Sequence, residues 1–248
     1  MLVFVIIVLL PALFVALPAF QAVFTKALPD TLLGSGVWSD FWQSLLVSYG
    51  LGAIVTVLGF IMGLPMAILI ARKKLGKSFA SLLDILVNIP LIVPSIALGV
   101  SLKFFWKESF PFMPEMLLLI FAHLAITYPY IVKSMAAAFE RISMDMEEAA
   151  RTLGAKPFNV FKTIIMPLTK YSILSGAIMV FTRSVSETGA TLAVVTNLRT
   201  APVVIVDWVK GTVSATPLEI GLGCGLLVLF SFLILFVLRL VTKGKGGY

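Results

Sequence analysis

Two ionisable side chains lie inside an apolar stretch in the last third of the chain. Arg183 and Glu187 are four residues apart within 171–195, among apolar and hydroxyl-bearing residues. A buried membrane carboxylate is costly, so it needs a charged partner or a wet cavity. On a helix this spacing lets the guanidinium reach the carboxylate. We expect a structural ion pair first, with a gate or pathway role as the alternative.

Other polar residues near this pair fit ordinary structural roles. Membrane serines and threonines commonly bond backbone carbonyls, and four lie here: Ser184, Ser186, Thr188 and Thr191. His123 is the only histidine and Cys224 the only cysteine, whereas a metal site needs several ligands. We therefore predict a hydrogen-bonded interior histidine, no metal site and no catalytic residue. Lys133 is expected to extend its ammonium group to the membrane interface.

A polar segment, Asp145 to Pro167, has the spacing of two short consecutive helices. Asp145 followed by Glu148 predicts a helix that begins with a capping box. Gly154 predicts a left-handed residue that ends this helix, and Pro157 is suited to the first turn of the next one. The segment would form a rigid lever at the membrane face.

The composition places these segments in a membrane protein. The chain has 248 residues, of which 60% are hydrophobic and only 12% charged, with a mean hydropathy of +1.07. Soluble domains average about 25% charged residues, and disordered chains lack so many apolar side chains. The basic residues flank apolar runs and form no nucleic-acid-binding stripe.

Apolar runs of about 20 residues predict the spans. Six such runs occur, at Leu2–Phe24, Phe41–Ala71, Leu82–Trp106, Glu115–Ala138, Tyr171–Val195 and Leu218–Val241. The loops on one side of the membrane would carry thirteen Lys and Arg residues, and those on the other side six. The side with thirteen, which includes both termini, is therefore expected to be cytoplasmic. The predicted fold is one all-α transmembrane domain, 1–248, with a cytoplasmic region at about 139–168 between spans four and five. We expect a multi-pass protein of the cell membrane.

The cytoplasmic region resembles the coupling motif of ABC importer permeases. The matching residues are Glu148, Ala149, Ala150, Gly154, Ile164 and Pro167, with Met166 where the family usually has Leu. That replacement conserves volume. The resemblance implies that the short helix docks on a cytoplasmic ATPase subunit and turns ATP binding into alternating access.

Further segments resemble the molybdate, tungstate and sulfate branch of type I importers. They are 41–45, 63–67, the proline-rich 88–95, 122–130, 186–192 and 200–203. This resemblance implies an oxyanion substrate, with tungstate or molybdate first and sulfate or thiosulfate next. Iron and thiamine permeases share a related Gly-Ala-Thr-Leu stretch, so ferric iron or thiamine remains an alternative. Because charged and hydroxyl-bearing residues inside a span can face a wet cavity, Arg183, Ser186, Glu187 and Thr188 are the candidates for a pathway or gate.

The chain has no phosphate-binding loop of the Gly-x-x-x-x-Gly-Lys-[Ser/Thr] type, so we expect no ATPase activity of its own. ATP and Mg²⁺ would bind to a partner, and this chain would bind no cofactor. The expected partners are a second permease, most simply another copy, two cytoplasmic ATPase subunits and an extracytoplasmic binding protein. The rival from another class is a self-sufficient secondary transporter that uses its few intramembrane ionisable residues.

Overall fold

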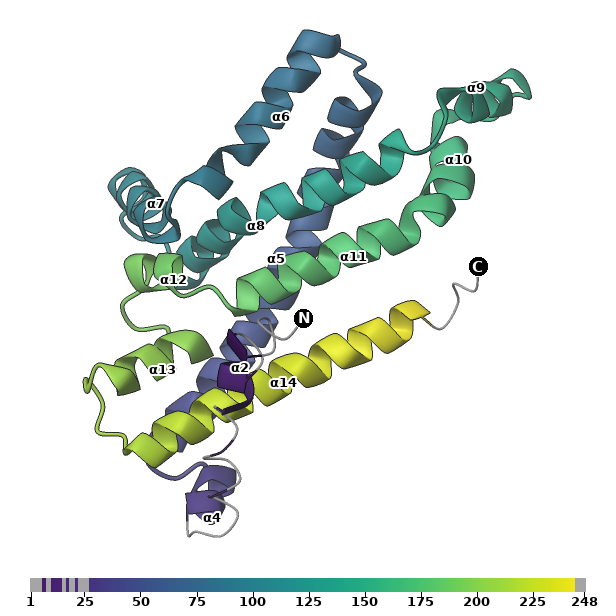
Figure 1. Cartoon of the computed structure of the whole chain (residues 1–248). Coiled ribbons are helices and arrows are strands. Elements are labelled where there is room, and N and C mark those ends of the chain that lie inside the picture. The colour runs from purple at the N-terminus through teal and green to yellow at the C-terminus, as the bar shows by residue number, and fades with distance from the viewer. Residues whose placement is uncertain (1–5, 8–9, 15–16, 18–20, 22–26, 244–248) are drawn as a thin grey trace. The chain divides into compact units, whose positions relative to one another are not determined.

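A computed structural model describes residues 6–7, 10–14, 17, 21 and 27–243, shown in Figure 1. Every regular element in this part of the chain is a helix. The predicted first span, Leu2–Phe24, lies mostly outside the described residues, which include only the short helix α2 (Leu10–Phe14) and a few neighbours. The far ends of both termini also lie outside them.

The chain divides into two compact units, 1–50 with 195–244 and 51–194 with 245–248. The first unit contains α4 (Ala27–Leu33), the beginning of α5 (Val37–Arg72), α13 (Ala201–Val209) and α14 (Pro217–Lys243). Its core joins aromatic residues of α5 to α13 and α14. Trp38 packs edge-on against Trp208 at 5.3 Å between ring centroids. The Ala201 amide donates to Ser48 Oγ at 2.8 Å, which ties the start of α13 to α5.

The second unit holds the rest of α5 and seven further α-helices in the described residues. They are α6 (Lys77–Ile92), α7 (Ser95–Ser109), α8 (Glu115–Glu140), α9 (Met144–Thr152), α10 (Pro157–Val160), α11 (Met166–Val185) and α12 (Gly189–Val194), with a π-helical turn at Phe161–Ile165. The buried helix α8 packs against α6, α7, α11 and α12. Figure 1 shows α9 and the turn after α5 at one end of this unit, with α7 and α12 at the other.

Four helical segments in the described residues are long and apolar enough to cross a membrane. They are Val37–Arg72, Glu115–Glu140, Pro157–Val185 and Pro217–Leu238, and the pair α6 and α7 would add a fifth span. Pro65 and Pro129 lie inside α5 and α8 without ending them. Three of the predicted runs therefore correspond to continuous helices of closely similar bounds.

The prediction of one continuous span at Leu82–Trp106 is wrong. The axis bends by 105° between α6 and α7. Proline disfavours helical geometry in the residue before it and lacks an N–H group, so Val93 is extended (φ −77°, ψ 130°) and Pro94 precedes a new helix. Pro90 is accommodated inside α6. The helix is therefore broken at Pro94, the second of the two prolines.

The predicted run Tyr171–Val195 also differs from the structure. Its helix is part of a longer segment that begins at Pro157 and ends at Val185, and α12 begins after the turn at 186–188. The following segment, expected to be a loop, contains α13. Glu187 consequently lies in a turn between two helices and not within a continuous span.

Candidate functional site

The polar segment after α8 forms the predicted helix, turn and helix, with one change at its start. Helix α9 begins at Met144 after the N-cap residue Ser143, two residues before the predicted cap at Asp145, and no side chain caps it. The predicted cap by Asp145 is therefore wrong. At the other end Gly154 has a φ of +86°, and its N–H donates to the Arg151 carbonyl at 2.9 Å. The Ala155 N–H donates to Ala150 at 3.1 Å, which completes the paired C-terminal cap of a Schellman motif.

The second half of the segment leads directly into α11. Pro157 starts α10, as predicted. Ile164 is half-buried in the π-helical turn, and Pro167 is exposed in the first turn of α11. Single π-helical turns often occur at functional sites because they re-aim the side chains around them. The segment is therefore continuous with a candidate span.

A buried ion pair connects α9 to the end of α5. The Arg72 guanidinium contacts the Glu147 carboxylate, and both side chains are at most one-tenth exposed. Arg72 Nη1 also donates to the Ile142 carbonyl at 3.2 Å, just before α9. Arg151, one turn after Glu147, lies 3.9 Å from the same carboxylate. Because the opposite charges of Arg72 and Glu147 are paired away from solvent, they hold α9 at a defined position relative to α5.

Glu148 differs sharply from its neighbour. Its side chain is exposed, as is that of Ala149, while Ala150 is half-buried. No ion pair or side-chain hydrogen bond of Glu148 occurs among the described residues; its carbonyl accepts from Thr152 Oγ1 at 2.9 Å. Thus α9 uses one acidic residue to attach to the rest of the unit and leaves the next one exposed.

A second polar cluster joins α8, α11 and α12. His123 Nδ1 lies 2.8 Å from Ser184 Oγ, and its Nε2 lies 2.9 Å from Thr191 Oγ1. All three side chains are buried. The single hydroxyl hydrogen of Thr191 is directed to the Glu187 carbonyl at 3.2 Å, so its oxygen accepts from His123 Nε2–H. In a neutral imidazole this leaves Nδ1 to accept from the Ser184 hydroxyl.

Glu187 extends this cluster through the turn between α11 and α12. Its carboxylate lies 2.6 Å from Arg183 Nη1, and its other oxygen accepts from the Ala190 amide at 3.0 Å. Glu187 is 2% exposed, whereas about a third of the Arg183 side chain is accessible. The predicted ion pair and the predicted hydrogen-bonded histidine are confirmed. Ser186 and Thr188 bond backbone carbonyls, as expected.

The cluster acts as a three-helix connection with one charged group at its edge. Arg183 uses one guanidinium nitrogen for Glu187 and leaves part of the group accessible. The accessible part of the guanidinium can contact an anion, but the adjacent Glu187 carboxylate would repel a dianion. This arrangement suits a fixed turn or a gate better than a high-affinity anion site.

Three partners were missed from the sequence. They are Arg72, Asp84 and Glu147, whose ion pairs join residues far apart in the chain. Lys133 does not simply extend to the interface, since its Nζ lies 2.5 Å from Asp84 Oδ1. Acidic and apolar residues alternate around Glu147, and this local pattern does not indicate a partner far away in the chain.

Comparison with known proteins places this geometry in a family. The profile described as binding-protein-dependent transport system inner membrane component matches residues 59–243. The chain is similar to the molybdate/tungstate transport system permease protein of Pyrococcus furiosus, with 30% identity across 94% of this chain and 92% of that protein. The molybdenum transport system permease protein of Mycobacterium bovis is 29% identical, across 94% and 93% of the two chains.

The fold is similar to that of a solved transporter. A chain of the MetNI methionine ABC transporter, in inward-facing conformations, gives a TM-score of 0.67 at 19% identity, covering 90% of this chain and all of that one. Together with the match over most of the sequence, this fold agrees with the helical architecture described above. The chain belongs to the family of binding-protein-dependent transport system inner membrane components, the permease subunits of ABC importers.

Proposed function

We propose that this permease imports molybdate or tungstate. The support is the similarity to permeases named for these oxyanions, which extends over nearly the full length of both chains. Those relatives lend no support to sulfate, ferric iron or thiamine. Family membership likewise favours an ATP-driven importer over a secondary transporter.

The proposed topology has six spans and both termini in the cytoplasm. The positive-inside count supports it, because the basic turn 72–77 and the segment 139–168 belong to the lysine- and arginine-rich side. The contact between Arg72 and Glu147 is consistent with both lying on one side of the membrane. Leu2–Phe24 would supply the first span, and the bent pair α6 and α7 the third.

The observation that carries the coupling proposal is that Glu147 is buried in an ion pair whereas the next residue, Glu148, is exposed. The exposed Glu148 surface of α9 would dock on a cytoplasmic ATPase subunit, while the buried Glu147 pair would transmit the movement to α5. Ala149, Ala150 and Gly154 would shape the docking helix, and Ile164 and Pro167 would connect it to α11. ATP hydrolysis would occur on the partner, and alternating access would follow because the ATPase favours one permease state by differential contact.

The working assembly would contain two permeases, most simply two copies of this chain. Two ATPase subunits would bind the cytoplasmic face, and an extracytoplasmic binding protein would deliver the oxyanion. The Arg183–Glu187 pair would primarily fix the turn before α12. A gate or pathway formed by Arg183, Ser186, Glu187 and Thr188 is the alternative, favoured by the partial accessibility of Arg183.

Reconstitution tests this function. The chain is co-expressed with its ATPase and binding protein, and ATP hydrolysis is measured with the binding protein loaded with molybdate, tungstate, sulfate, ferric iron or thiamine. We expect molybdate or tungstate to stimulate hydrolysis. Stimulation by another substrate would refute the molybdate or tungstate assignment, and failure of the ATPase to assemble would refute the coupling assignment.

A further inference from the structure

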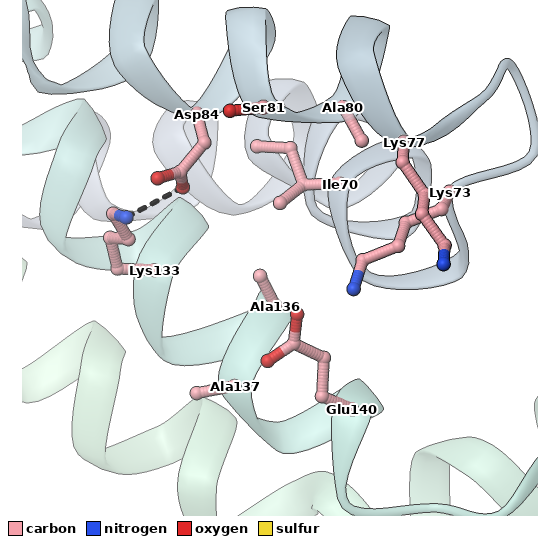
Figure 2. A pocket seen from close by; sticks show the side chains of 10 residues that line it. All are labelled: Ile70, Lys73, Lys77, Ala80, Ser81, Asp84, Lys133, Ala136, Ala137 and Glu140. Carbon is pink, nitrogen blue, oxygen red and sulfur yellow. Dashed lines mark hydrogen bonds and ion pairs between the residues drawn. The ribbon is translucent and has the colours of Figure 1, made fainter.

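A polar cavity of about 500 Å³ lies between the end of α5, the start of α6 and the last turns of α8, shown in Figure 2. Its charged lining consists of Lys73, Lys77, Asp84, Lys133 and Glu140. Asp84 and Lys133 satisfy each other at 2.5 Å. Lys73, Lys77 and Glu140 have no ion-pair partner among the described residues. The cavity therefore offers two ammonium groups on one wall and one carboxylate on the other.

The backbone at Lys73 is unusual. Lys73 has a φ of +51°, the only positive value among the described residues other than glycine. A lysine adopts this left-handed conformation at an energetic cost, and glycine is the usual residue after a helix. Lys73 directly follows α5. A charged residue at this position is consistent with a function for its side chain, because such strain is concentrated at functional sites.

An apolar cavity of about 340 Å³ follows along the same three helices. Met66 lies one turn before Ile70 of the polar cavity, Val87 lies three residues after Asp84, and Tyr128 lies five residues before Lys133. In each of the three helices, the residue that lines the apolar cavity therefore lies farther from the basic turn 72–77 than the residue that lines the polar cavity. Large side chains on the adjoining face of α6 are exposed, including Leu86 at 49%. The two cavities therefore follow one another along α5, α6 and α8, and together they are called the groove here, with a cationic mouth and an apolar floor.

We propose that this groove binds an anionic phospholipid. The lipid phosphate would lie at Lys73 and Lys77, and a hydrocarbon chain would follow the apolar part between α6 and α8. Glu140 would accept hydrogen bonds from head-group hydroxyls, which favours phosphatidylglycerol over a head group with an additional carboxylate. Basic sites on the cytoplasmic side of membrane helices suit anionic lipids. A free oxyanion would use the ammonium groups but would gain nothing from the apolar floor.

Lipid binding to the purified full-length chain tests the charged part. Retention of phosphatidylglycerol is titrated in detergent by native mass spectrometry, with phosphatidylcholine as the neutral comparison. The K73Q/K77Q double variant should weaken phosphatidylglycerol binding by at least about tenfold, since each lysine contributes near the membrane surface. K74Q/K170Q removes the same charge from the same predicted side outside this cavity and should change binding less than twofold. Equal losses in both double variants, or equal retention of phosphatidylcholine, would overturn the proposal.

A substitution in the apolar part separates a lipid from a free anion. Ala125 lines the apolar cavity, and A125F should fill it and weaken phosphatidylglycerol binding while leaving the charged mouth intact. L86F is a second variant at an exposed position, in case A125F disturbs folding. Inorganic phosphate or molybdate is also tested as a competitor. If K73Q/K77Q abolishes this competition and both phenylalanine variants leave it unchanged, the site belongs to a free oxyanion instead. Lipid retained by the isolated chain but absent from the assembled transporter would show that a protein partner covers the groove.

Discussion

Arg72, at the end of α5, and Glu147, in α9, form a buried ion pair that joins a candidate span to the proposed docking helix. Arg72 also donates to the Ile142 carbonyl, so the guanidinium holds both the side chain and the backbone at the start of α9. A rigid connection of this kind is needed wherever movement of a docked helix must reach the spans. The pair therefore links the family motif to the membrane part of the same compact unit.

Neutralising Glu147 should loosen this connection. E147Q leaves the Arg72 guanidinium buried without its counter-charge, and loss of one partner of a buried pair costs about 3–5 kcal/mol. We expect a lower free energy of unfolding, measured in detergent by denaturant titration. E148Q is the matched control: because Glu148 is exposed, it should leave stability unchanged but weaken co-purification of the ATPase. Equal stability loss in both variants would contradict the assignment of separate roles.

Gly154 should be required for the end of α9. An alanine at φ +86° would adopt a conformation that costs about 1–2 kcal/mol, although no other atom lies within 4 Å of its Cβ. We expect G154A to increase local opening, seen as faster amide hydrogen exchange at the end of α9. G50A is the control, because it adds a Cβ in open space within a helix and should not speed exchange there. Unchanged exchange in G154A would show that the cap is dispensable.

Continuous apolar runs made α5, α8 and α14 predictable to within about four residues at each end. The run 82–106 could not be resolved in the same way, because Pro90 and Pro94 are locally similar. Pro90 is tolerated inside α6, whereas Pro94 starts a new helix whose path depends on packing against α12. Hydropathy measures how apolar a segment is, and tertiary contacts decide where it bends.

The same distinction holds for the polar residues. The Arg183–Glu187 pair was predictable because four residues bring side chains together on a helix. The Arg72–Glu147 and Lys133–Asp84 pairs join residues far apart in the chain, and no local spacing indicates them. Asp145 was expected to cap α9, but the N-cap is two residues earlier, because α8 ends at Glu140 and Ser143 is already extended.

Close packing of α7 on α12 should make Gly99 intolerant of a side chain. A Cβ there would lie 2.8 Å from Ala190 Cα and 2.9 Å from its carbonyl oxygen, and backbone atoms cannot move aside as a flexible side chain can. We expect G99A to reduce the free energy of unfolding by about 1–3 kcal/mol, the usual range for overpacking. In G59A the nearest atom is Ile131 Cγ2 at 3.6 Å, so stability should be maintained. Equal stability of the two variants would refute the close approach.

His123 should contribute through its hydrogen bonds and not through its size alone. H123L leaves the Ser184 hydroxyl buried without the imidazole, which should cost about 1–2 kcal/mol in a membrane protein. Thr191 keeps its bond to the Glu187 carbonyl. Adding S184A to H123L should recover part of the loss, because the orphaned polar group is then removed. Additive losses in a double-mutant cycle of unfolding free energies would show that the two side chains do not interact.

The Arg183–Glu187 pair allows structure and gating to be separated. R183Q should destabilise the chain by about 2–3 kcal/mol, because it leaves the buried Glu187 carboxylate with only the Ala190 amide as a partner. The loss should be smaller than for a fully buried pair, because Arg183 is partly exposed. The R183Q/E187Q double variant removes both charges, and its glutamine can still accept from Ala190, so stability should recover. If the pair is structural, molybdate-stimulated ATP hydrolysis and uptake in proteoliposomes should recover with it. Restored unfolding free energy without restored uptake would instead assign the pair to the gate, since the fold would be intact and only the charges missing.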